Sequence, residues 1–292
     1  MLPRSLLSAT PLLFVLLWST GFIGSKLGAP YAPPMMFLTL RFLIVLPLIA
    51  MIALAMKGRW PKSKAMIFHC IVIGALIHGV YLGCVFWAID NGMPAGMSAV
   101  VVGLQPVISA LFAALLLRES IGMRHVSGLL LGLVGVFLVL APGADFSQPG
   151  VQVATIAAVA LAVTAISFGT VYQKRFVHET DLLPATTWQY VGAVLVTLPL
   201  TFLETRSVEW SGEFIFALGW LVLVLSIGAI LLLMFLIRKG AVSEVASLFY
   251  LVPVATSIES YFLFGETLVL SQIGGMILVA LAVVLIRRKA RV

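Results

Sequence analysis

Two ionisable side chains, Arg41 and Glu259, lie within long apolar stretches of this 292-residue chain. If these stretches cross a membrane, both charges are costly and should face a partner or a cavity. We therefore expect Arg41 and Glu259 to pair or to form part of an outer gate, unless each snorkels or bonds locally. A site for sugar nucleotides or phosphates would need several Lys or Arg residues. With Arg41 as the clear cation at this depth, a zwitterion or an uncharged amphiphile is the favoured ligand.

Other candidate binding residues sit within the apolar stretches, most of them near the middle. Polar groups at this depth usually face a site or a partner, and aromatic rings stack on flat apolar groups. Ordinary core packing is the alternative, because Trp and Tyr also collect at membrane interfaces. The candidate binding residues are Trp18, Ser19, His78, Tyr81, Gln105, Trp188 and Tyr250.

Two prolines interrupt the apolar stretches at Pro106 and Pro253. Each removes a helical donor and frees a carbonyl, near positions 102 and 249 respectively. These acceptors could bind an ammonium group, or neighbouring helices could cover them. A histidine side chain titrates near neutral pH, so His78 makes coupling to proton movement conceivable. A lone histidine that faces a neighbouring helix is the more common situation, and facilitated diffusion is fully compatible with the sequence.

The elements that must position these residues are predicted to be membrane-spanning helices. Apolar residues make up 62% of the chain, charged residues 10%, and the mean hydropathy is +1.16, whereas a soluble domain has roughly 25% charged residues. One helical crossing takes about 20 residues, and barrel strands take only about 10. We therefore predict an all-α integral membrane protein. Its ten spans are 11–28, 34–56, 65–89, 94–117, 123–140, 151–173, 184–203, 213–237, 242–264 and 268–286.

The orientation follows from the basic residues in the loops. Fifteen Lys and Arg residues fall on one side of the predicted bundle, against Lys26 and Arg206 on the other. Because Lys and Arg accumulate in cytoplasmic loops, both termini are predicted to be cytoplasmic. The net charge of +7 is then explained by helix ends and contact with anionic lipid, and not by nucleic-acid binding. The first stretch lacks a convincing cleavage site, so we interpret it as a retained helix.

Catalytic and metal chemistry is not indicated. An intramembrane enzyme would need a nucleophile with a base, a metal cluster or paired acids, and the four histidines are scattered along the chain. Cys70 and Cys84 are separated by fourteen residues, about 21 Å along one helix, which is too far for a disulfide. We expect no enzyme activity, no metal and no cofactor.

The two halves of the chain repeat one another. At an offset of 148 the first stretch matches the sixth, through Ser19 and Ser167, Gly21 and Gly169, and Lys26 and Lys174. At an offset of 147 Pro106 and Glu119 match Pro253 and Glu266, each Pro standing thirteen residues before its Glu. Five helices per half is an odd number, so the second half must enter the membrane upside down. We predict two inverted five-helix repeats, 1–145 and 146–292, with a central cavity between them.

These features resemble the drug/metabolite transporter superfamily, in particular its ten-helix EamA-type members. The resemblance covers essentially the whole chain and rests on the duplicated unit and its two signatures. One runs from Leu104-Gln105-Pro106-Val107 to Leu117-Arg118-Glu119, the other from Leu251-Val252-Pro253-Val254 to Phe264-Gly265-Glu266. Among such members the chain looks most similar to the YddG-like exporters of aromatic amino acids.

The resemblance implies export of small organic solutes, often amino acids, across a bacterial inner membrane by alternating access. A broad-specificity drug or nucleoside exporter is the main alternative, and a channel or a lipid flippase is a lesser one. The expected partners are a small-molecule substrate and membrane lipid, with proton coupling left open and no nucleic acid. We expect a monomer or a weak homodimer.

Overall fold

The computed structural model describes residues 4–118, 122–140, 152–177, 180–239, 248, 251–265 and 267–287, and their regular secondary structure is helical. The first half contains α1 (Arg4–Gly28), α2 (Pro34–Ala55), α3 (Lys64–Gly74), η1 (Ala75–Val80), α4 (Tyr81–Asp90), α5 (Ala95–Val102), α6 (Gln105–Leu117) and α7 (Met123–Leu140). The second half contains α8 (Val153–Phe176), α9 (Leu182–Thr201), α10 (Gly212–Gly219), η2 (Trp220–Ala229), α11 (Ile230–Lys239), α13 (Val252–Phe264) and α14 (Leu270–Arg287).

Several of these helices have the length of a bilayer crossing. Within the described ranges, Thr10–Gly28, Pro34–Ala55, Lys64–Asp90, Val153–Phe176 and Gly212–Leu233 are each long and apolar enough to cross a membrane. They correspond to the first, second, third, sixth and eighth predicted spans. The seventh predicted span corresponds to α9, and the fifth and tenth correspond to α7 and α14. The all-helical membrane fold predicted from the sequence is confirmed.

The fourth predicted span, 94–117, is not one continuous helix. It is divided into α5 and α6, with Gly103 and Leu104 between them. Pro106 stands in the first turn of α6, where its missing N–H matters least, so the chain restarts the helix there and does not run through. Proline plays the same part in the second half, where Pro253 lies in the first turn of α13.

The bounds of the helices repeat between the halves. α6 and α13 are each 13 residues long and begin 147 positions apart, and α7 and α14, of 18 residues each, do the same. Both α6 and α13 end in a residue with left-handed backbone, Arg118 (φ 55°) and Gly265 (φ 65°). The π-helical segments η1 and η2 also fall at matching places. The offset read from the sequence is therefore a structural repeat.

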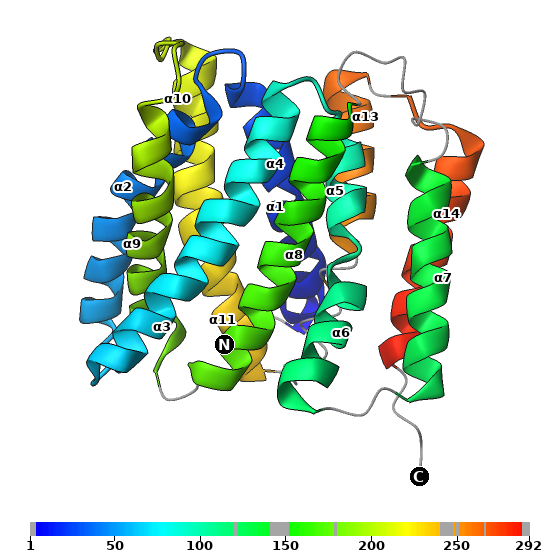
Figure 1. Ribbon diagram of the computed structural model, residues 1–292, viewed down its shortest axis with the longest axis horizontal. Helices are drawn as coiled ribbons and strands as arrows, with labels where there is room; N and C mark the ends of the chain where they lie inside the picture. Colours follow the sequence, from blue (N-terminus) through cyan, green and yellow to red (C-terminus); the bar gives the residue numbers. More distant parts are fainter. Residues whose placement is uncertain are drawn as a thin grey trace.

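Elements of the two halves interleave in the bundle. α2 packs on α9 at one edge and α7 on α14 at the other, while α1 packs on α13 and α8 on α6 (Figure 1). α1 and its counterpart α8 run in opposite directions, and α1 begins at the same end of the bundle where α14 ends. The contact of α1 with α13 thus has its counterpart in the contact of α8 with α6.

Candidate functional site

Arg41 lies in the first half of α2 with its side chain inside the bundle. The residue is only 4% exposed, and its Nε donates a hydrogen bond to Ser226 Oγ on η2 at 3.0 Å. Its Nη1 is buried and has no hydrogen-bond partner among the described residues. A buried guanidinium holds several donors in a rigid fork, so this one presents a cation with spare donor capacity.

The counterpart of Arg41 in the second half is Gln189, 148 positions later on α9. Gln189 is also 4% exposed, and its side chain lies beside that of His78 on η1. His78 is in turn the counterpart of Ser226. The contact between α2 and η2 is therefore repeated between α9 and η1, as a pseudo-twofold axis requires.

Aromatic rings surround these four polar residues. Phe42 and Tyr190 are counterparts on α2 and α9, and their ring centroids are 5.6 Å apart. The His78 ring lies 4.9 Å from that of Tyr190. Tyr190 also lies beside the Ser226 side chain. We name the group formed by Arg41, His78, Gln189, Tyr190 and Ser226 the Arg41 cluster.

His78 and Ser226 both stand on π-helical segments, η1 and η2. A π-helix widens the backbone ladder and is found most often at functional sites, where it re-aims side chains. In both halves the widening falls at the cluster. Tyr81 follows η1 directly and is buried near the Arg41 guanidinium.

Glu259 lies apart from the Arg41 cluster. Its Oε1 is 2.7 Å from Ser19 Oγ on α1, and its Oε2 is buried without a partner in the described part of the chain. Each of the two charged residues thus bonds to a serine, and the structure has no ion pair between Arg41 and Glu259, both of which it describes. Both bonds join helices that are far apart in the sequence.

The remaining predicted residues are distributed over several helices. Trp18 is half-buried beside Phe14, with ring centroids 5.3 Å apart. The backbone carbonyl of Gln105 accepts a hydrogen bond from Ser167 Oγ at 3.1 Å, which joins α6 to α8. Trp188 is half-buried on α9. Tyr250 lies outside the described residues.

Gln189, Tyr190 and Ser226 were not singled out from the sequence. The internal repeat contained the signal, because adding 148 to the positions of Arg41, Phe42 and His78 gives 189, 190 and 226. The repeat was read from matching residue types, whereas these counterparts differ in type and match only in position.

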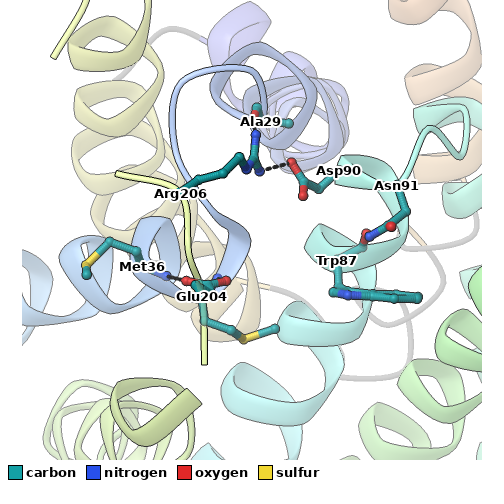
Figure 2. A network of polar contacts seen from close by, with 8 residues as sticks. Ala29, Met36, Trp87, Asp90, Asn91, Glu204 and Arg206 are labelled. Atoms are coloured by element: carbon teal, nitrogen blue, oxygen red, sulfur yellow. Dashed lines mark hydrogen bonds and ion pairs between the residues drawn. The ribbon is translucent and has the colours of Figure 1, made fainter. Parts of the chain in front are cut away.

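At the end of the bundle where α2 begins, a loop from the second half binds the first half. Glu204 accepts hydrogen bonds from the backbone N–H groups of Met35 and Met36, at 2.7 and 2.8 Å. Arg206 donates to Asp90 at 2.5 Å. Figure 2 shows the Glu204 carboxylate against the start of α2 and Arg206 reaching Asp90.

The carboxylate of Glu204 titrates above its ordinary range. Partial burial raises the pKa of Glu204, and nearby Asp90 adds to the rise, while the amides of Met35 and Met36 and the charge of Arg206 oppose it. At the opposite end of the bundle Arg59 and Asp181 form a matching link, with Nη2 and Oδ1 3.2 Å apart. Both ends of the bundle therefore have polar ties between the halves.

Metal ligands do not gather in the described ranges: no group of three or more His, Cys, Asp or Glu residues there could hold a metal ion. The chemistry that this site offers is hydrogen bonding and charge pairing within an aromatic surrounding.

Comparison with known proteins gives consistent matches over the whole chain. The model of the EamA-like transporter family matches residues 6–141 and 153–288. An uncharacterized transporter of Bacillus subtilis, YvbV, is 29% identical over 99% of this chain and 94% of its own. A probable amino-acid metabolite efflux pump of Salmonella typhimurium is 25% identical over 96% of both chains. The uncharacterized inner membrane transporter YedA of Escherichia coli is 28% identical over 91% of this chain and 86% of its own.

The fold also has a counterpart among solved structures. One crystal structure matches with a TM-score of 0.70 over 99% of both chains, at 22% sequence identity. At that level of identity the likeness concerns the fold.

Proposed function

Because the chain belongs to the EamA-like transporter family, we propose that it exports small amphipathic metabolites, foremost amino acids including aromatic ones, by alternating access. The family and the relatives are transporters and not enzymes, so the chain is a membrane transporter. The class of solute, the direction of transport and the transport mechanism are our proposals.

The observation that carries the proposal is the pair of unpartnered donors in the Arg41 cluster. Nη1 of Arg41 and Nε2 of Gln189 are both buried with no partner in the described ranges. A buried donor left unpaired costs about 1–3 kcal/mol, and more when it is charged. A carboxylate supplies acceptors for both, and Arg binds carboxylates with high geometric specificity. We infer that the Arg41 cluster binds the solute's carboxylate.

The rings beside these donors suit the other end of an aromatic amino acid. Phe42, Tyr190 and the His78 ring offer flat apolar faces within one group. Offset or edge-on contacts between rings contribute about 0.5–1.5 kcal/mol beyond area burial. The relative in Salmonella typhimurium named as a probable amino-acid metabolite efflux pump favours the same class of solute.

The contacts that the cluster makes with both halves support alternating access. Arg41 belongs to the first half and donates to Ser226 of the second. Gln189 belongs to the second half and lies beside His78 of the first. Rocking one half against the other would lengthen one set of contacts and shorten its counterpart. A solute held between the halves would then be exposed first to one side of the membrane and then to the other.

The orientation that we propose places both termini in the cytoplasm of a bacterial cell, at the inner membrane. Support comes from the basic loops and from α1 beginning at the same end where α14 ends. The link made by Glu204 and Arg206 then lies at the outer face, and the link between Arg59 and Asp181 at the cytoplasmic face.

The direct test is transport by the purified chain in proteoliposomes. We expect uptake of radiolabelled phenylalanine, tryptophan and threonine, and competition by unlabelled phenylalanine. Phenylethylamine, which lacks the carboxylate, should compete poorly. If these amino acids fail to cross while a nucleoside or a cationic drug does, the chain is a broad-specificity exporter. Lipid scrambling, or flux that does not saturate, would instead indicate a flippase or a channel.

A further inference from the structure

A second polar site lies away from the Arg41 cluster, where α13 meets α1. We propose that Glu259 binds a proton within the membrane and carries it in exchange for the exported solute. The inference deepens the proposed export function and rests on it for the solute, while the protonation of Glu259 is tested without any solute.

The hydrogen-bond geometry around Ser19 requires one more proton than the serine supplies. Ser19 Oγ lies 2.8 Å from the carbonyl oxygen of Leu16 and 2.7 Å from Glu259 Oε1. A hydroxyl has one proton to donate, and both neighbouring oxygens are acceptors if Glu259 is ionised. When Glu259 is protonated, its O–H donates to Ser19 Oγ and Ser19 donates to Leu16. All three oxygens are then satisfied.

The second oxygen of Glu259 points to the same protonation state. Oε2 is buried and has no hydrogen-bond partner among the residues that the structure describes. An ionised carboxylate in a low-dielectric surrounding is expensive unless both oxygens are bonded. A neutral acid tolerates one unbonded oxygen far better, because it carries no net charge.

The fold itself does not need an acid at this place. The position that corresponds to Glu259 in α6, 147 residues earlier, is Phe112. The Phe112 ring packs edge-on against Phe168 of α8, with centroids 5.4 Å apart. The same helix contact is thus made by aromatic rings in one half and by Ser19 and Glu259 in the other. A role beyond packing explains why an ionisable group stands there.

Other charges near the site are few in the described ranges. On α1 the nearest is Lys26, whose Nζ lies 4.3 Å from the ring centroid of Phe264 at the end of α13. α13 itself adds the phenol of Tyr261, and α5 contributes no ionisable residue. Arg238 and Lys239 are the last two residues of α11, which lies toward the opposite end of the bundle from α13. A proton on Glu259 therefore neutralises its carboxylate in the way that a paired cation would.

Hydroxyl groups accompany Glu259 along the contact of the three helices. Ser25 on α1, Ser98 on α5 and Ser260 on α13 are buried, and none of their hydroxyls has a partner among the described residues. A serine hydroxyl both donates and accepts. Groups of this kind, alone or with water, are suited to passing a proton to Glu259.

Release of the proton would change the contact between the halves. The bonds from Glu259 to Ser19 and from Thr256 Oγ1 to the Ser19 carbonyl, at 3.4 Å, tie α13 to α1. Once ionised, Glu259 competes with the Leu16 carbonyl for the single Ser19 proton and seeks water. The protonated state therefore favours the packing of α13 on α1 seen here. The ionised state favours a conformation in which Glu259 is exposed to water. Differential stability of this kind couples proton binding to conformation.

Infrared spectroscopy tests the protonation directly on the purified full chain. The carbonyl stretching band of a protonated carboxylic acid is absent from an ionised carboxylate. We expect wild type at neutral pH to show this band and Glu259→Gln to lack it. Glu213→Gln, which alters an exposed Glu in the first turn of α10, is the matched control and should keep it. Identical spectra of wild type and Glu259→Gln in this region would overturn the proposal.

Transport in proteoliposomes tests the exchange. We expect an acidic interior to accelerate wild-type uptake of labelled phenylalanine severalfold over equal pH on both sides. Glu259→Gln should lose this acceleration and retain exchange of labelled for unlabelled phenylalanine at equal pH, because its packing is conserved. Acceleration that persists in Glu259→Gln would contradict proton carriage by Glu259. If wild type moves other solutes but not phenylalanine, the proposed function fails, and the spectrum still decides protonation.

Discussion

Arg41 on α2 and Gln189 on α9 are counterparts in the two halves of the chain, and each keeps one buried nitrogen without a partner among the described residues. Each also contacts the other half: Arg41 donates to Ser226, and Gln189 lies beside His78. Only one of the two carries a charge. The twofold arrangement therefore frames a site in which one of two equivalent positions carries the charge.

Removing the guanidinium should abolish the preference for carboxylates. We expect Arg41→Met to lower uptake of phenylalanine by about 10- to 100-fold, since a hydrogen bond to a charged group contributes about 1.5–3 kcal/mol. Arg41→Lys should restore little, because an ammonium cannot reproduce the planar fork. Initial rates of uptake into proteoliposomes measure both effects.

The control for this prediction is Arg124→Gln, which changes an exposed cation on α7. Its uptake should match that of wild type. Competition by phenylethylamine should be similar in wild type and Arg41→Met, because that compound has no carboxylate that Arg41 could bind. If Arg41→Met transported phenylalanine normally, the Arg41 cluster would be a packing feature.

The aromatic residues Trp18 and Tyr81 should contribute to transport without being needed for insertion. Trp18 is half-buried against Phe14, and Tyr81 lies near the guanidinium of Arg41. We expect Trp18→Ala or Tyr81→Ala to reduce uptake severalfold while the amount of protein in the membrane fraction stays close to wild type.

An exposed tryptophan provides the comparison. Trp210 lies in the loop before α10, and Trp210→Ala should leave uptake unchanged. Normal flux in the double variant of Trp18 and Tyr81 would assign both side chains to packing.

The sequence predicted the positions of the helices well because its signals act along the chain. Hydrophobic length indicated the spans, and the two Pro-to-Glu signatures indicated matching positions, at which α6 and α13 begin. The break itself was underestimated, since 94–117 was predicted as one span although Pro106 lies inside it.

The pairing of Arg41 with Glu259 was harder to judge from the sequence. Similar depth in the membrane made the pair conceivable, but depth says nothing about the direction in which a helix face points. In the structure α2 packs on α9, α4 and η2, whereas α13 packs on α1 and α5. The neighbouring helices determine that Arg41 bonds to Ser226 and Glu259 to Ser19. Which helices are neighbours is known only from the three-dimensional structure.

Close contact between α3 and α9 predicts a strong effect of one added methyl group. A Cβ on Gly192 would lie 2.0 Å from the carbonyl oxygen of Ile71 and 2.9 Å from the Ala75 nitrogen. Both are backbone atoms, so the helices must separate. We expect Gly192→Ala to reduce the free energy of unfolding by about 1–3 kcal/mol, as overpacking does. Thermal unfolding in detergent measures the change.

The matched variant is Gly219→Ala, because a Cβ there meets nothing within 4 Å. It should be neutral or slightly stabilising, since alanine favours helix over glycine. Equal loss of stability in both variants would mean that helix contact is not the cause. Gly74→Ala, whose Cβ would fall 1.8 Å from the Gln189 carbonyl oxygen, should impair uptake as well, because it displaces a member of the Arg41 cluster.

Glu204 should make the stability of its link to the start of α2 depend on pH. Its pKa lies above the ordinary value of 4.5 because of partial burial, so the folded protein binds the proton more tightly than the unfolded chain does. The resulting contribution to stability is fully present below the ordinary pKa and is lost as the pH rises through the raised one. On acidification from neutral pH, wild type should gain stability relative to Glu204→Gln, which cannot titrate.

The measurement is the difference in unfolding temperature between wild type and Glu204→Gln over a pH series. Taking the difference cancels the titration of all other groups that behave alike in both proteins. Glu209→Gln removes an exposed carboxylate from the same loop and should follow wild type throughout. A difference that moves in favour of wild type as the pH rises would show the opposite sign. The amides of Met35 and Met36 and the charge of Arg206 would then outweigh burial, and the link would tighten when Glu204 is ionised.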